Sequence, residues 1–162
     1  MKRVMLAVVA ALSLVGVGVG LAGTSPDGLP KNTSVFGGGH FVFNTGRNFS
    51  LTASKGVGTL QYGVARIRAE VTCLNVSGNA AAVGGIIRDS IEPSIVGDLW
   101  YMHLVDNGPP VGQATGGDTV SPIMILEPSA DPGGLPKSCP APDPSQAVYA
   151  LDAGDILVHS SS

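Results

Sequence analysis

Two aspartates on either side of a glycine- and proline-rich segment are the first candidates for chemistry in this sequence. Asp106 opens the run Asp-Asn-Gly-Pro-Pro, and Asp118 follows twelve residues later. Two carboxylates placed in this way could bind Ca²⁺, a cation that takes oxygen ligands. However, Asp-Asn-Gly is an ordinary turn sequence, and the chain contains no calcium loop of the DxDxDG type that ends in Glu. We therefore favour turn capping over a calcium site, and we predict no metal and no cofactor.

The three histidines, His40, His103 and His159, lie far apart in the sequence. No HxH or HExxH spacing places two of them on one face of an element, so the pattern does not predict a metal or catalytic cluster. The sequence contains no G-x-S-x-G motif, the turn that positions a catalytic serine. It also contains no pair of carboxylates that stands out as a candidate for glycoside hydrolysis. We predict no catalytic residue. Whether the protein is an enzyme stays open, with a non-enzymatic role favoured.

Cys73 and Cys139 are the only two cysteines of the chain. They allow a single pairing, and an exported protein meets an oxidising environment in which disulfides form. Without a CxxC motif or matching histidines they do not make a zinc site. We predict a disulfide that ties the proline-rich stretch around Cys139 to a strand. Two independent buried thiols, or one reactive thiol, are the alternatives.

Residues 1–22 have the three-part pattern of a secretory signal peptide. Lys2 and Arg3 form a positively charged N-terminal region, which is followed by an apolar core. Gly20 and Ala22 are the small residues of a cleavage site. An uncleaved membrane anchor is the alternative, because the apolar segment is just long enough to span a bilayer. We predict a cleaved signal and a secreted protein. No later apolar run is long enough for a membrane span, so we predict none in the mature chain.

The composition excludes several classes of protein. The 162 residues include 9 Lys+Arg and 12 Asp+Glu, a formal net charge of −3. Removing Lys2 and Arg3 leaves 7 positive and 12 negative groups, or −5. Such a chain lacks the basic face of a nucleic-acid binder, so we predict no nucleic-acid partner. With 44% hydrophobic and 13% charged residues and 23 glycines, it matches neither a disordered chain nor a helical bundle.

Short segments in which apolar and polar residues alternate predict the elements of the domain. The clearest is 65–76, where Ile67, Ala69, Val71 and Cys73 fall on one face. Its other face carries charged side chains that we expect to form a solvated ion cluster, namely Arg66, Arg68 and Glu70. The predicted strands are approximately 40–44, 47–54, 57–62, 65–76, 80–88, 98–105, 119–127 and 156–159, and 146–151 could be a helical turn or a further strand.

About eight strands without a clear helical pattern indicate an all-β, antiparallel domain. Their spacing is typical of an up-and-down barrel or a barrel-like sandwich. We expect residues 23–39, which end in three glycines, to be a flexible leader after the signal peptide, and 40–159 to form the single β-barrel domain. Within this domain, 128–145 holds six prolines and is predicted to be a long irregular loop.

The central stretch 72–85, TCLNVSGNAAAVGG, resembles a group of small exported bacterial proteins of unknown function. In that group a TCLxVxGNxAxVGG hairpin is followed by a strand ending in VDNG and then by an Asp-containing turn. Here the VDNG motif is 105–108, and Asp118 fills the later position. Weaker similarity extends over 37–159. The resemblance implies a bacterial source and a compact antiparallel barrel or barrel-like sandwich, and it supplies no activity.

The same resemblance assigns the two faces of the strand 98–105. By analogy, Trp100, Met102 and Leu104 point inward, and Tyr101 and His103 point outward. Members of the group tend to carry small hydroxyl residues at the outward positions, whereas this chain has an aromatic residue and a histidine. We interpret Tyr101 and His103 as a candidate contact patch for a ligand or partner.

Two functional hypotheses remain. The first is a non-enzymatic secreted module that acts by surface binding, outside the cell or in the cell envelope, on an unknown protein or envelope partner. The second is a barrel whose interior cavity binds or transforms a small apolar ligand, as lipocalin-like and cyclase-type barrels do. The interior volume discriminates between them. Side chains that fill the barrel axis, Trp100 and Met102 among them, would contradict the second hypothesis.

Overall fold

The computed structural model describes residues 32–63, 65–108, 117–126 and 138–160. The predicted signal peptide lies outside these residues, as do most of the predicted leader and part of the proline-rich loop. Within the described residues, no helix has the length and apolar character needed to cross a membrane.

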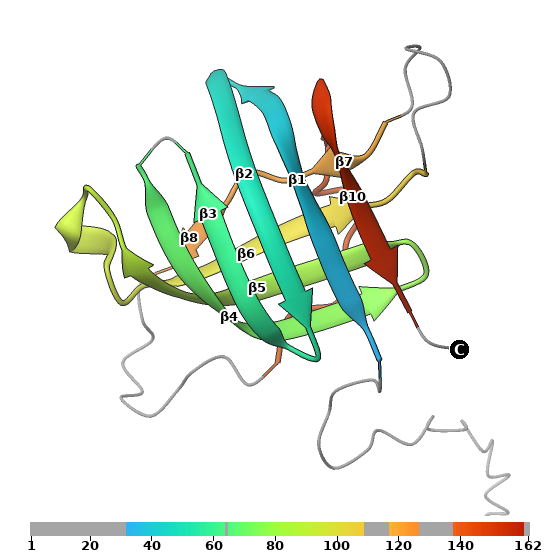
Figure 1. The fold of residues 1–162 in the computed structure, drawn as a ribbon, viewed down its shortest axis with the longest axis horizontal. Coiled ribbons are helices and arrows are strands. Elements are labelled where there is room, and N and C mark those ends of the chain that lie inside the picture. Colours follow the sequence, from blue (N-terminus) through green and yellow to red (C-terminus); the bar gives the residue numbers. More distant parts are fainter. Residues whose placement is uncertain (1–31, 64, 109–116, 127–137, 161–162) are drawn as a thin grey trace, which may run out of the picture.

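Ten antiparallel strands form one sheet that curls into a half-barrel (Figure 1). The prediction of an all-β, antiparallel fold is therefore confirmed. Neighbours in the sheet follow the order β10-β1-β2-β3-β4-β5-β6-β7-β9, and β8 pairs with β6. The elements are β1 (Ser34–Phe43), β2 (Thr45–Ser54), β3 (Val57–Tyr62), β4 (Ile67–Ser77), β5 (Ala80–Asp89), the 3₁₀ turn η1 (Pro93–Ile95), β6 (Leu99–Val105), β7 (Thr119–Val120), β8 (Met124–Leu126), β9 (Tyr149–Ala150) and β10 (Ala153–His159).

Tight turns make β1 to β5 a meander in which each strand pairs with the next. The turn between β2 and β3 consists of Lys55 and Gly56, with φ of 52° and 76°. Two positive φ values in a two-residue loop are typical of a type I′ turn, whose twist matches that of the flanking strands. Gly78, with φ of 60°, lies in the corresponding turn between β4 and β5.

β1 begins at Ser34, inside the range 23–39 that the composition predicts to be a flexible leader. The three glycines of that range lie between β10 and β2. A Cβ atom at Gly37 would overlap the carbonyl oxygen of Asp155 on β10, and one at Gly38 would contact the backbone of β2. These glycines therefore allow three backbones to approach closely, and the prediction of a leader was wrong from Ser34 onward.

Pro122 divides the predicted strand 119–127 into two short strands. β7 ends at Val120 and β8 begins at Met124, because proline has no N–H to donate to a neighbouring strand. Both strands still pair with β6, but at different positions along it.

The hydrophobic core lies on the concave face of the sheet. Trp100, Met102 and Leu104 of β6 are all buried there, which confirms the inward face expected for that strand. The indole N–H of Trp100 donates to the carbonyl oxygen of Glu70 at 3.3 Å. The largest fully buried side chains include Trp100, Phe41, Leu60, Ile87, Met102, Leu104 and Ile156.

A bulge between Val71 and Cys73 reverses the faces of β4. Simple alternation places these two residues together on the inward face. In the structure Val71 lies in the core cluster, but after the bulge Leu74 packs there instead of Cys73. The prediction was wrong for Cys73 because the extra residue, Thr72, shifts the alternation by one. Cys73 therefore lies on the outer face of the sheet, where it meets Cys139.

Candidate functional site

Residues 138–147, which follow the undescribed residues 127–137, cross the outer face of the sheet, and we call this segment the strap. Cys73 and Cys139 form a disulfide with their Cα atoms 5.2 Å apart, which confirms the predicted pairing. Next to the disulfide, the side-chain amide of Asn75 donates to the carbonyl oxygen of Pro140 at 3.1 Å. Two neighbouring outer-face residues of β4 thus hold the beginning of the strap.

The strap covers His103, which the sequence analysis placed on an exposed contact patch. His103 is only 6% exposed, and its Nδ1 accepts the backbone N–H of Asp143 at 3.2 Å. Burial lowers the pKa of His103, and the nearby Asp143 carboxylate partly opposes this effect. The prediction of an exposed His103 was therefore wrong, because a distant part of the same chain binds it. Tyr101 is half-buried, and its role in binding stays a prediction.

Small residues on the outer face of β5 make room for its neighbours: Ala80 for the strap, and Gly84 for the ring of Tyr101. Ala80, Ala82 and Gly84 alternate along this strand, and all three are buried. Ala147 of the strap packs with Ala80 and with Val105 in a second, separate apolar cluster. The outer face of β5 and β6 is thus in contact with the strap of the same chain.

The histidines do not converge. His40 Nδ1 lies 2.6 Å from Asp152 Oδ1 on the surface, and His159 lies opposite Ser34 at the other end of β1. Among the residues that the structure describes, no three His, Cys, Asp or Glu side chains gather as potential metal ligands.

Asp106 and Asp118 join the end of β6 to β10. Each of their four carboxylate oxygens accepts a backbone N–H. The bonds are Asp106 Oδ1 to Gly108 (2.8 Å), Asp106 Oδ2 to Val158 (3.0 Å), Asp118 Oδ1 to Asn107 (2.9 Å) and Asp118 Oδ2 to Ile156 (2.6 Å). On its other edge β10 pairs with β1. The two carboxylates therefore bind the edge of β10 at which a neighbouring strand would otherwise pair, and we call this contact the carboxylate seam.

The carboxylate seam accounts for the two aspartates without a calcium ion. The predicted turn capping is confirmed for Asp106 by its bond to the N–H of Gly108, two residues on. Sequence reasoning missed the bonds to β10, since no local pattern relates residues so far apart. Burial raises the pKa of Asp118, the N–H bonds from Ile156 and Asn107 oppose this, and the nearby carboxyl groups of Asp155 and Asp106 raise it further.

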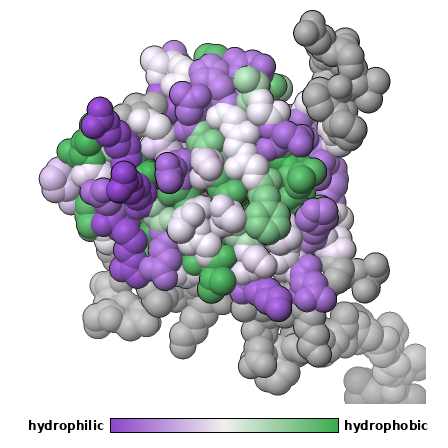
Figure 2. Space-filling model, viewed as in Figure 1, coloured by the Kyte–Doolittle hydropathy of each residue, from purple (hydrophilic) through white to green (hydrophobic). Residues whose placement is uncertain are grey.

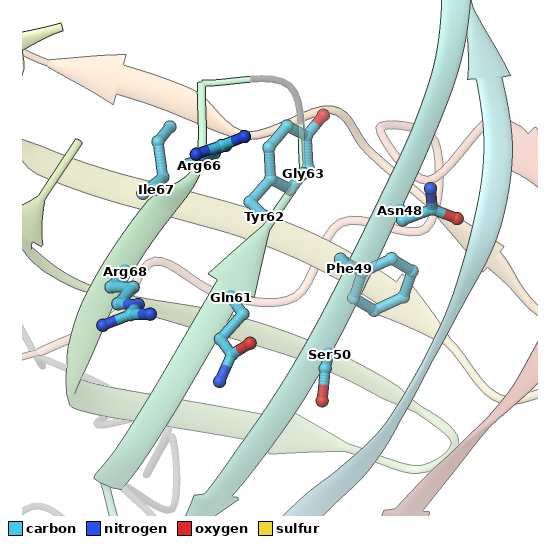
Figure 3. Close-up of a pocket in the computed structure, with 9 residues that line it drawn as sticks. All are labelled: Asn48, Phe49, Ser50, Gln61, Tyr62, Gly63, Arg66, Ile67 and Arg68. Atoms are coloured by element: carbon cyan, nitrogen blue, oxygen red, sulfur yellow. The ribbon is translucent and has the colours of Figure 1, made fainter. Parts of the chain in front are cut away.

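A pocket of about 380 Å³ opens on β2, β3 and β4, away from the strap (Figure 3). Ser50, Gln61 and Arg68 are direct cross-strand neighbours, and Figure 3 shows them side by side at one level of the three strands. The core residues Phe49, Tyr62 and Ile67 also line the pocket. The remaining lining residues are Asn48, Gly63 and Arg66.

The two arginines of the pocket are not paired within the described part of the chain. Their expected partner, Glu70, instead forms an ion pair with Arg88 on β5. Arg88 Nη2 and Glu70 Oε2 are 2.6 Å apart. The prediction of an ion cluster of Arg66, Arg68 and Glu70 was therefore wrong. Asp89 lies opposite Arg68 on β5 but makes no described ion pair with it. No acidic residue lines the pocket, so its charge is positive in an acidic protein.

Arg66 has an unusual backbone conformation at the rim of the pocket. Its φ is 48°, in the left-handed region that favours glycine, and its N–H donates to the carbonyl oxygen of Gly63 at 3.3 Å. For a long side chain this conformation costs about 1–2 kcal/mol. Strain of this kind is found preferentially at functional sites.

The outer face around the pocket is hydrophilic. In Figure 2, strongly hydrophilic side chains gather on the β3 and β4 side of the molecule, and apolar ones lie over β1 and β10. The exposed cross-strand pair Phe36 and Leu157 belongs to the apolar part.

Comparison with known proteins gives no match: no family model, curated protein or solved structure is significantly similar to this chain. The resemblance of the central hairpin to small exported bacterial proteins therefore stays a prediction.

Proposed function

We propose that this chain is an exported, non-enzymatic binding module that acts through the outer surface of its half-barrel, outside the cell or in the cell envelope. The packed interior carries this proposal. Trp100 and Met102 are fully buried in a single core cluster, at the positions where an interior ligand would lie. This packing argues against the alternative of an interior cavity, and a binding site on the outside is the simpler expectation.

Export is supported by two independent features. Residues 1–22 have the pattern of a signal peptide. The disulfide between Cys73 and Cys139 suits an oxidising compartment, in which such bonds persist.

The polar groups that first suggested chemistry serve the fold. Asp106 and Asp118 bind backbone N–H groups in the carboxylate seam, and His103 holds the strap. Several outward-facing polar residues that have no such task gather in the pocket on β2–β4, among them Ser50, Gln61 and Arg68, which makes this pocket the best candidate for binding a ligand.

Mass spectrometry of protein purified from its native source tests both parts of the proposal. The denatured, unreduced protein is expected to have the mass of residues 23–162 with one disulfide. Under native conditions the protein is expected to have the same mass, since the packed core holds no ligand. A full-length chain confined to the cell would contradict export, and a retained apolar small molecule would contradict the packed interior.

Hydroxyl-radical footprinting tests binding at the surface. The labelled protein is compared in buffer and in concentrated extracellular fluid of the same source. Protection is expected at residues 48–68 on the outer face of β2–β4, with the strap as an internal reference. Equal labelling of 48–68 in both conditions would contradict a binding role for this face.

A further inference from the structure

We propose that the pocket on β2–β4 binds a carboxylate-bearing saccharide of the uronic acid class. Arg68, assisted by Arg66, binds the carboxylate, and Asn48, Ser50 and Gln61 bind ring hydroxyls. This inference rests on the proposed surface-binding function and names the ligand of that surface.

The charges favour an anionic ligand. The planar guanidinium group matches a carboxylate, with which it makes paired N–H···O bonds. Arg68 is accessible for this contact, because the neighbouring Glu70 is bound to Arg88 and none of the lining residues is acidic. An anion in the pocket therefore displaces no described ion pair.

The neutral side chains favour a polyhydroxylated ligand over a bare inorganic anion. Asn48 and Gln61 each carry an amide that both donates and accepts hydrogen bonds, and the hydroxyl of Ser50 does the same. The row from Ser50 across Gln61 to Arg68 spans two strand spacings, or about 9.5 Å. A row of that length exceeds what one sulfate ion can contact, whereas a sugar ring with its substituents can reach along it.

The local backbone keeps the pocket open and places Arg66 at its rim. Gly63 lies beside Asn48, and a Cβ atom there would be 3.2 Å from the Asn48 carbonyl oxygen and 3.5 Å from its Cβ. The missing side chain thus leaves space in the pocket. Arg66 keeps its strained conformation in the following turn, where Figure 3 shows its side chain next to Tyr62 and Gly63.

Calorimetric titration of the purified protein at low salt tests the ligand class with three probes. Glucuronate is expected to bind, and glucose, which has the same ring without the carboxylate, is expected to bind at least about tenfold more weakly because it lacks a charge-assisted contact. Sulfate is also expected to be about tenfold weaker than glucuronate. Equal affinity for glucuronate and glucose would overturn the role of the arginines, and equal affinity for sulfate would overturn the saccharide.

A pair of matched arginine variants locates the binding site. Arg68→Gln removes the pocket charge and is expected to weaken glucuronate binding about tenfold. The double variant Glu70→Gln/Arg88→Gln removes both members of the neighbouring ion pair, so it changes no net charge and frees no carboxylate, and it is expected to leave the affinity unchanged. Equal effects of the two variants would overturn the assignment to the pocket. Because the replaced side chains lie on the surface, thermal unfolding is expected to show that both variants fold.

The outcome also separates this inference from the proposed function. If glucuronate does not bind but residues 48–68 are protected in extracellular fluid, the ligand class is wrong and surface binding stands. If neither result is obtained, the proposed function fails as well.

Discussion

Arg66 combines a strained backbone with a position at the rim of the pocket. Its positive φ is unfavourable for any residue with a Cβ atom, and its side chain has no described ion-pair partner that would compensate for it. Natural proteins keep such positions where the strained residue serves a purpose other than stability. At Arg66 we propose that this purpose is ligand binding at the rim of the saccharide pocket.

Arg66→Gly is therefore expected to stabilise the protein while it weakens glucuronate binding. Glycine adopts a positive φ without strain, and the relief exceeds its entropic cost in the unfolded chain, for a net gain of up to about 1 kcal/mol. The control is Arg68→Gly, which lies within β4 and has no positive φ, and it is expected to destabilise the protein. Chemical denaturation measures both. A loss of stability in Arg66→Gly would contradict the argument from strain.

Asp118 gives the carboxylate seam a defined pH dependence. Its pKa is raised above the ordinary 3.8, so the folded protein binds the proton more tightly than the unfolded chain. The stability that this proton contributes is fully present below pH 3.8 and is lost as the pH rises through the raised pKa.

Asp118→Asn tests the carboxylate seam at two pH values. The amide can accept only one of the two N–H bonds, so we expect a loss of about 1–3 kcal/mol at pH 7. As the pH is lowered toward 3.8, the free energy of unfolding of the wild type should rise relative to that of the variant. Denaturation at both pH values measures the difference, with the exposed Asp89→Asn as the control. A difference that shrinks at low pH would contradict the raised pKa.

At the scale of elements, the strap depends on residues that are far from it in sequence. The bulge at Thr72 turns Cys73 outward, and the small side chain of Ala80 on β5 leaves space for the strap above it. The strap in turn buries His103. The disulfide is the covalent part of this contact.

Replacing both cysteines by alanine is expected to destabilise the protein by about 2–4 kcal/mol, because the disulfide closes a 66-residue separation in the unfolded chain. The ten-stranded sheet should persist, since its hydrogen bonds do not involve the strap. Hydrogen exchange is expected to rise at the backbone N–H of Asp143 and to stay low in the centre of β5. Unchanged exchange at Asp143 would show that the disulfide is not needed to hold the strap.

Local patterns were enough to predict much of this sheet. Alternation and turn residues give the bounds of β3, the inward face of β6 and the turn at Lys55–Gly56. These local patterns fail where the orientation or burial of a residue depends on neighbours that are distant in sequence. Cys73 lies outward because of a bulge, and His103 is buried because the strap crosses it.

The candidate site could be predicted only in part. The pattern places Arg66 and Arg68 on the outer face, and the structure agrees. The pairing of Glu70 with Arg88 depends on the register between β4 and β5, which two bulges change. The sequence alone therefore does not reveal that Glu70 forms its ion pair with Arg88 and not with the arginines of the pocket.

At the scale of the whole molecule, the interior of the half-barrel is filled by its own residues. β10 pairs with β1 on one edge and meets the carboxylate seam on the other. Trp100, Met102 and their neighbours occupy the space inside. We therefore propose that ligand recognition takes place on the outer surface.

The most direct test is an NMR titration of the uniformly ¹⁵N-labelled protein with glucuronate. We expect saturable shifts in the side-chain amides of Asn48 and Gln61 and in the Arg68 Nε–Hε signal, with the indole signal of the buried Trp100 unchanged. A saturable shift of the Trp100 indole signal without changes at Gln61 and Arg68 would place the ligand inside the barrel and contradict binding at the outer surface.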